Sequence, residues 1–196
     1  ADIENMTGKQ AEYFSSDAPL RILQEELQIE KLSNMSPNTV DFIVASVQEV
    51  NTPDPNLYGR YFFLLGEDFF ERGWKYRNAG DDANAVTAFN DAVSMWNHVD
   101  PDRHPKVMPY ALDALGDAYL LMNQPDTARD YYLQAASYDY PRKWDVLVGL
   151  AGIYQKQGND SEALSYYRQV INDYPDCRAG KFAQVRSAVI RAKQSK

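Results

Sequence analysis

Apolar residues between positions 109 and 141 recur at steps of three and four, which is the period of an amphipathic helix. Two such stripes follow one another. The first consists of Leu112, Leu115, Tyr119 and Met122, and the second of Ala128, Tyr132 and Ala135. Asn123, which tolerates a left-handed conformation, and Pro125, which suits a first helical turn, stand between them. The stretch therefore predicts two short helices folded back on each other.

The same pattern returns upstream and downstream of this pair. Its small residue falls at Gly73, Gly116 and Ala151, at steps of 43 and 35 residues. A glycine inside a helix costs about 1 kcal/mol relative to alanine, so Gly116 predicts a close approach to Ala128 and Ala135. The second step is near the 34-residue period of the tetratricopeptide repeat. Over residues 66–175 the sequence resembles that family.

The resemblance implies an all-α, right-handed helical solenoid of stacked helix pairs. We expect a loose segment at 1–16, an N-terminal helical pair at 17–56, three repeats within 57–175 (about 66–97, 109–141 and 144–175) and a capping helix at 176–196. The N-terminal pair is either a cap or a degenerate repeat. It either covers the aromatic residues of a long helix over 57–79, or leaves some of them exposed for a partner or a homodimer. Asn159 and Glu162 have the spacing of a capping box.

The last helix is expected to turn apolar side chains inward and cationic ones outward, as an end helix of a solenoid does. The inward side chains would be Phe182, Val185, Val189 and Ile190, and the outward ones Arg178, Lys181, Arg186, Arg191 and Lys193.

Composition narrows the range of partners. The chain has 196 residues, 44% of them apolar, which suits one domain with an ordinary core. Its net charge of −8 argues against nucleic acid and anionic membranes and favours a basic partner. No apolar run approaches the length of a membrane span, and no signal peptide is evident, so we expect a soluble protein of the cytoplasm or periplasm. Cys177 is alone, so an intramolecular disulfide is excluded.

Two sets of residues could carry chemistry, and both have a plainer interpretation. One set alternates in the segment HVDPDRH and consists of His98, Asp100, Asp102 and His104, which are possible metal ligands. Prolines in this segment indicate a plain exposed turn. The other set, Asp113 and Asp117, could work as an acid/base pair. No nucleophile, oxyanion donor or phosphate loop accompanies it. We expect no enzyme activity, cofactor or metal.

The resemblance implies that a concave groove, lined by the first helix of each repeat, holds a protein or peptide. The residues at those positions are Glu67, Phe70, Trp74, Arg77 and Asn78 in the first repeat, Tyr110, Asp113, Asp117, Leu120 and Leu121 in the second, and Asp145, Val148, Gly152, Gln155 and Lys156 in the third. One subclass of the family binds the C-terminal carboxylate of a peptide with a clamp of lysine, asparagine and arginine. At the corresponding positions this chain has Phe70, Trp74, Asp113 and Asp117. The groove would therefore select a basic peptide. Alternatively, Phe70 and Trp74 belong to the core.

The resemblance thus predicts a non-catalytic scaffold or adaptor. A dedicated chaperone, similar to the small acidic chaperones of bacterial type III secretion, is the alternative. The long insertion at residues 97–108 argues against it.

Overall fold

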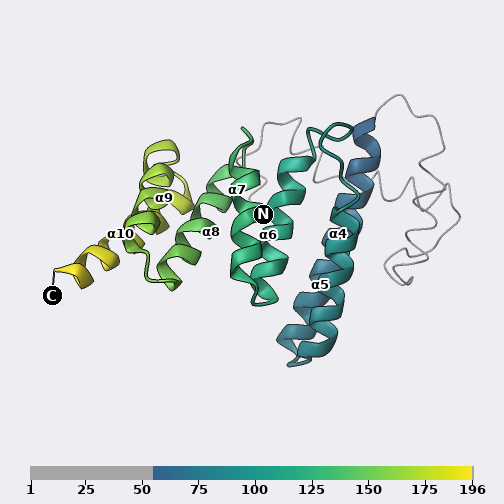
Figure 1. Ribbon diagram of the computed structural model, residues 1–196, viewed down its shortest axis with the longest axis horizontal. Coiled ribbons are helices and arrows are strands. Elements are labelled where there is room, and N and C mark those ends of the chain that lie inside the picture. The colour runs from purple at the N-terminus through teal and green to yellow at the C-terminus, as the bar shows by residue number, and fades with distance from the viewer. Residues whose placement is uncertain (1–54, 196) are drawn as a thin grey trace, which may run out of the picture. The chain divides into compact units, whose positions relative to one another are not determined.

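The computed structural model describes residues 55–195, with the backbone alone for 55–58, and this part of the chain is entirely helical (Figure 1). Its seven helices are α4 (Pro55–Asn78), α5 (Asp82–Trp96), α6 (Met108–Leu121), α7 (Pro125–Ala136), α8 (Lys143–Lys156), α9 (Asp160–Asp173) and α10 (Arg178–Gln194). No strand occurs among these residues. The all-α class is confirmed. The predicted loose segment and N-terminal helical pair lie outside the described residues.

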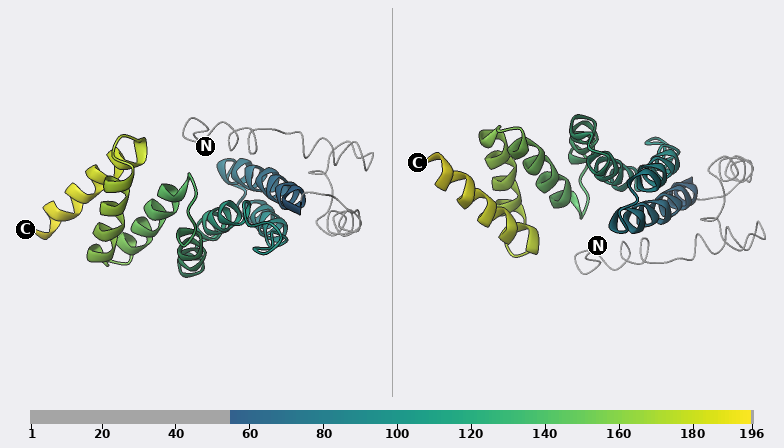
Figure 2. Two further views of the ribbon diagram at one scale, coloured as in Figure 1. Left: turned by 90° about the horizontal axis from the view of Figure 1, so that it is seen from above. Right: turned by 90° about the horizontal axis from the view of Figure 1, so that it is seen from below.

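The chain divides into two compact units after Ala118, a point inside α6. In the N-terminal unit, α4 and α5 run side by side and are joined by a turn at Gly80, whose φ is 80° (Figure 1). In the C-terminal unit, α7 packs on α8, α8 on α9, and α9 on α10, each helix turning back on the one before (Figure 2). Among residues 55–195, no helix is both long and apolar enough to cross a bilayer.

Glycines on α4 receive aromatic rings from α5. A Cβ atom added to Gly73 would come within 2.5 Å of the Phe89 ring, and one added to Gly66 would overlap the Trp96 indole. The indole Nε1–H donates a hydrogen bond to the Phe63 carbonyl oxygen at 3.1 Å. Neighbouring helices therefore do approach closely at small residues, and the partner at these two positions is an aromatic ring rather than another small side chain.

The local turn signals are largely confirmed. Asn123 has a φ of 60°, and Pro125 occupies the first turn of α7. The capping box predicted at Asn159 is wrong, because its side chain makes no capping hydrogen bond. At α10, Cys177 is the N-cap residue, and its sulfur accepts a hydrogen bond from the Gly180 N–H at 3.4 Å.

A stacked pair of tyrosines occurs twice in the C-terminal unit. Tyr119 lies on Tyr131 with ring centroids 5.3 Å apart, and Tyr154 lies on Tyr166 at 5.6 Å. Each tyrosine of the second pair follows its counterpart by 35 residues. The sequence period therefore reappears as a repeated contact between rings.

The orientation predicted for α10 is wrong for its apolar side chains, whereas the cations Arg178, Lys181, Arg191 and Lys193 are exposed as predicted. Phe182, Val185 and Val189 were expected to point inward, but they are 47%, 63% and 40% exposed. Only Ile190 of that set is buried. The buried residues of the core around α8, α9 and α10 are Leu147, Ala151, Ala163, Tyr167, Val170, Ala179, Ala183 and Ile190. Small residues thus make most of the contact surface of α10.

Two glycines of α8 provide a matched test of close helix packing. A Cβ atom at Gly149 would lie 2.8 Å from the ring of Tyr132, which is buried, whereas a Cβ at Gly152 would meet no atom within 4 Å. We expect Gly149→Ala to destabilise the protein by about 1–3 kcal/mol through overpacking. Gly152→Ala should stabilise it by up to about 1 kcal/mol through helix propensity. Urea denaturation measures both, and equal effects would contradict the contact.

The orientation of α10 is tested by truncating one buried and one exposed side chain. Ile190→Ala should cost about 2–5 kcal/mol, because it leaves a cavity in the core. Val185→Ala should change the free energy of unfolding by no more than about 0.5 kcal/mol, because its side chain is in solvent. A larger loss of stability for Val185→Ala than for Ile190→Ala, measured by thermal or urea unfolding, would support the orientation predicted from the sequence.

Candidate functional site

The C-terminal unit contains an open cavity of about 410 Å³, which we call the α8–α10 cavity. Helix α8 contributes Val148, Gly152, Gln155 and Lys156 to its lining, and α10 contributes Phe182, Arg186 and Lys193. Ile153 of α8, Tyr167 of α9 and Leu120 at the end of α6 add to the apolar part of the lining. The cavity therefore has two helical walls that belong to one compact unit.

The packing of α10 explains why its larger side chains reach this cavity. Ala179, Ala183 and Ser187 are buried and recur every four residues, so they form the face that packs against the unit. The neighbouring face of α10 carries Phe182 and Arg186, and these two side chains lie beside α8 at the cavity. The cavity wall is thus a consequence of which stripe of α10 is buried.

A hydrogen-bonded group holds Arg186 at the cavity. Its Nη2 donates to Gln155 Oε1 at 2.7 Å, and the Tyr167 hydroxyl donates to the same oxygen at 3.5 Å. The guanidinium carbon lies 6.0 Å from the centroid of the Phe182 ring. The Nε atom of Arg186 is shielded from water and makes no hydrogen bond within residues 55–195. The hydrogen-bond acceptor of this cation is therefore the neutral amide oxygen of Gln155.

The structure brings together part of the predicted groove. Leu120, Val148 and Gln155, assigned to it from the sequence, line this one cavity together with Gly152 and Lys156. Partner binding by these residues stays a prediction. Asp145 does not line the cavity, and its carboxylate pairs with Arg142 at 2.8 Å in the first turn of α8.

The groove residues predicted on α4 differ in accessibility. Those with exposed side chains are Glu67, Trp74 and Asn78, and those that are half-buried are Phe70 and Arg77. The Phe70 ring packs 5.4 Å from Phe89 and 5.6 Å from Trp96, centroid to centroid. Phe70 therefore belongs to the interface of α4 with α5, whereas Trp74 is 40% exposed.

The predicted groove residues on α6 are mostly covered. Tyr110 and Asp113 are only 5% and 3% exposed, and Asp117 and Leu121 are half-buried. A side chain with so little exposed surface cannot contact a partner without a rearrangement. The expectation that Tyr110 and Asp113 form an accessible wall is thus contradicted by their burial.

The turn in the histidine segment is exposed at Pro101, Asp102 and Pro105, as the sequence indicated, but its histidines pack inward. His104 is 2% exposed, and its Nδ1 accepts a hydrogen bond from the backbone N–H of Asp100 at 2.9 Å. His98 stacks on Phe62 with centroids 4.8 Å apart. Gly59 makes room, because a Cβ there would lie 2.7 Å from His104. Within residues 55–195, no three His, Cys, Asp or Glu side chains are grouped as a metal site would require.

The burial of His104 predicts that acid destabilises the N-terminal unit. Burial and the charge of Arg103 lower the pKa of His104 below its ordinary value of 6.5, and the opposing effect of Asp100 is smaller. Below pH 6.5 the unfolded chain therefore binds more protons than the folded chain, so the free energy of unfolding falls on acidification. This contribution is intact above that pH.

We expect His104→Asn to flatten the pH dependence of unfolding between about pH 7 and pH 5, because its amide oxygen accepts the same hydrogen bond without titrating. His98→Asn, the same substitution at the other histidine of the segment, is measured beside it. Urea denaturation across this range measures both. An unchanged slope in His104→Asn would show that another group carries the acid sensitivity.

Sequence reasoning missed the contribution of Phe182, Arg186 and Lys193 to the cavity. It assigned Phe182 to the core and the two cations to a solvated outer face of an end helix. A signal was present in the small residues Ala179 and Ala183, which share one face of the helix with Ser187. A stripe of small residues permits closer helix packing than a stripe of Phe and Val, and Ala179 and Ala183 are indeed part of the buried core.

Comparison with known families agrees with this architecture. Two profiles of the tetratricopeptide repeat match the chain, one over residues 111–143 and the other over residues 145–176. The first match covers most of α6 and all of α7, and the second covers most of α8 and all of α9. No curated protein matches the chain. Residues 111–143 and 145–176 are therefore tetratricopeptide repeats, and the helix-only fold of residues 55–195 agrees with the all-α helical solenoid of that family.

Proposed function

We propose that this chain is a non-catalytic adaptor that binds a segment of a protein partner in the α8–α10 cavity. Tetratricopeptide repeats generally mediate interactions between proteins. The observation that supports this particular site is the open cavity of about 410 Å³ between two helices of the C-terminal unit. Its volume is within the range of cavities that hold ligands.

The exposed apolar face of α10 supports the same location. Phe182, Val185 and Val189 are among the large apolar side chains exposed within residues 55–195, and they follow one another at steps of three and four. Phe182 lines the cavity, so this face continues from the cavity along the helix. Contiguous exposed apolar side chains beside a concave site are typical of an interaction surface.

The other functions considered from the sequence have no specific observation in their favour within residues 55–195. The dedicated chaperone and the homodimer stay predictions. For an enzyme or metal site, two of the six candidate side chains are covered or engaged otherwise: Asp113 is buried, and Nδ1 of His104 accepts a backbone hydrogen bond.

Site-specific photo-crosslinking tests the proposal in cells that make the protein naturally. A benzoylphenylalanine at the exposed cavity residue Lys156 should form adducts with a partner protein. The same group at Leu133, exposed on α7 outside the cavity lining, is the matched control and should form few. Adding Phe182→Asp should reduce the adducts at position 156 by about tenfold, because it removes a cavity wall.

Equal adduct yields at positions 156 and 133 would contradict the proposal. So would adducts at position 156 that Phe182→Asp leaves unchanged. Circular dichroism of the variant establishes that a loss of adducts is not a loss of helix.

A further inference from the structure

We infer that the α8–α10 cavity takes an acidic segment, in which a bulky apolar side chain enters the cavity and flanking carboxylates meet its cations. The inference rests on the proposed function and names the chemistry of the partner. It reverses the basic peptide expected from the sequence.

The charge of the whole chain does not describe the charge at the cavity. Residues 1–118 carry 9 lysines and arginines against 20 aspartates and glutamates, a net charge of −11. Residues 119–196 carry 11 against 8, a net charge of +3. The overall −8 is therefore the sum of an acidic unit and a basic one. A partner that contacts only the C-terminal unit meets a positive surface.

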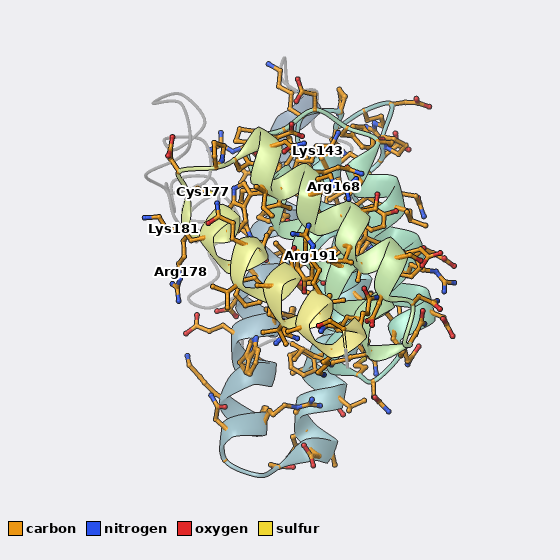
Figure 3. The ribbon with its side chains drawn as sticks, turned by 90° about the vertical axis from the view of Figure 1, so that its left-hand side faces the viewer. Lys143, Arg168, Cys177, Arg178, Lys181 and Arg191 are labelled. Atoms are coloured by element: carbon orange, nitrogen blue, oxygen red, sulfur yellow. The ribbon has the colours of Figure 1, made fainter. Side chains whose placement is uncertain are left out.

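The charged groups that line the cavity are all cations. They are Lys156, Arg186 and Lys193, and no carboxylate lines it among the described residues. None of the three forms an ion pair within residues 55–195. Helix α10 itself has five cations and no acidic residue. Figure 3 labels further basic side chains of this unit, including Arg168 on α9 and Arg178, Lys181 and Arg191 on α10. The positive potential is therefore not cancelled locally.

Arg186 is the group best placed to bind a carboxylate. Its Nη2 is held by Gln155 at 2.7 Å, so the guanidinium is positioned before a ligand arrives. Its hydrogen-bond partner is a neutral amide oxygen, and its Nε is shielded from water and makes no hydrogen bond within residues 55–195. A partly dehydrated cation without an anion gains most from a charged acceptor. A planar carboxylate matches the donor geometry of guanidinium.

The uncharged residues of the lining would accept the apolar side chain of the bound segment. Val148 and Phe182 provide apolar walls, and Gly152 leaves open space, because a Cβ there would meet no atom within 4 Å. Burying an apolar side chain in such a space is favourable by about 25 cal/mol for each Å² removed from water. A segment that combines Leu or Phe with Asp or Glu satisfies both parts of the cavity.

A protein segment fits this site better than an anionic membrane. Membrane-bound amphipathic helices present an outward apolar face to the lipid, whereas here the apolar and cationic groups line a hollow between α8 and α10. A basic segment would place like charges beside Arg186 and its neighbours, which opposes binding.

Three pools of fluorescent nine-residue peptides test the inference with the full chain. Each pool has Leu or Phe at its centre, flanked by Asp and Glu in the acidic pool, Ser and Gln in the neutral pool, and Lys and Arg in the basic pool. By fluorescence anisotropy at low salt, we expect the acidic pool to bind about tenfold more tightly than the neutral pool. The basic pool should bind most weakly.

Two variants locate the binding site. Arg186→Gln should weaken the acidic pool by about tenfold and leave the neutral pool nearly unchanged. Arg168→Gln, the same charge change at an exposed position of α9 outside the cavity lining, should have an effect of less than about twofold. Gly152→Leu, which fills the open space, should weaken every pool that enters the cavity, and circular dichroism checks that its helices persist.

Neutral and acidic pools of equal affinity, or an acidic pool that Arg186→Gln leaves unchanged, would overturn the inference and leave the proposed function standing. Failure of all three pools would also overturn it, and absence of crosslinks at position 156 would then overturn the proposed function as well. Tight binding to phosphatidylserine vesicles that Val185→Asp abolishes, with no peptide bound, would identify α10 as a membrane surface instead.

Discussion

Close approach between neighbouring helices at glycine positions is the constraint on which the packing of this chain depends. Phe89, Trp96 and Tyr132 are the rings that occupy these positions, and each is almost completely buried. A ring can lie on a helix backbone only where the Cβ atom is missing, so Gly73 and Gly149 determine which turns of the helices meet. The cost of a glycine in a helix is about 1 kcal/mol. Burying an aromatic side chain offsets it, because large apolar areas leave water.

The same preference for small residues at contacts explains the candidate site. Helix α10 packs through Ala179, Ala183 and Ser187, and its larger apolar side chains are left at the surface. An end helix that only covered the core would bury its bulkiest residues and expose its polar ones. Here the burial is the reverse, with Phe182 on the cavity wall and Val185 in solvent. Helix α10 therefore also forms one wall of the α8–α10 cavity.

Charge is divided between the two units, which limits what net charge says about partners. The acidic excess belongs to residues 1–118, and the unit that contains the cavity is basic. At physiological ionic strength, exposed charges act over about 8 Å. The cations that line the cavity lie within this range of a segment bound there. The net charge of the whole sequence hides this difference between the two units.

The helix pairs, their 35-residue step, and the turns at Asn123 and Pro125 could be determined from the sequence alone, because they depend on residues near one another in the chain. Only the tertiary structure decided which stripe of α10 is buried. That helix has two stripes that could be buried. Hydrophobicity predicts burial of the stripe with Phe and Val, whereas the structure buries the stripe with Ala and Ser, because small side chains allow closer packing. Burial of Asp113 and His104 was likewise set by neighbouring elements. Local periodicity specifies the helices, and the space between helices decides which side chains remain accessible.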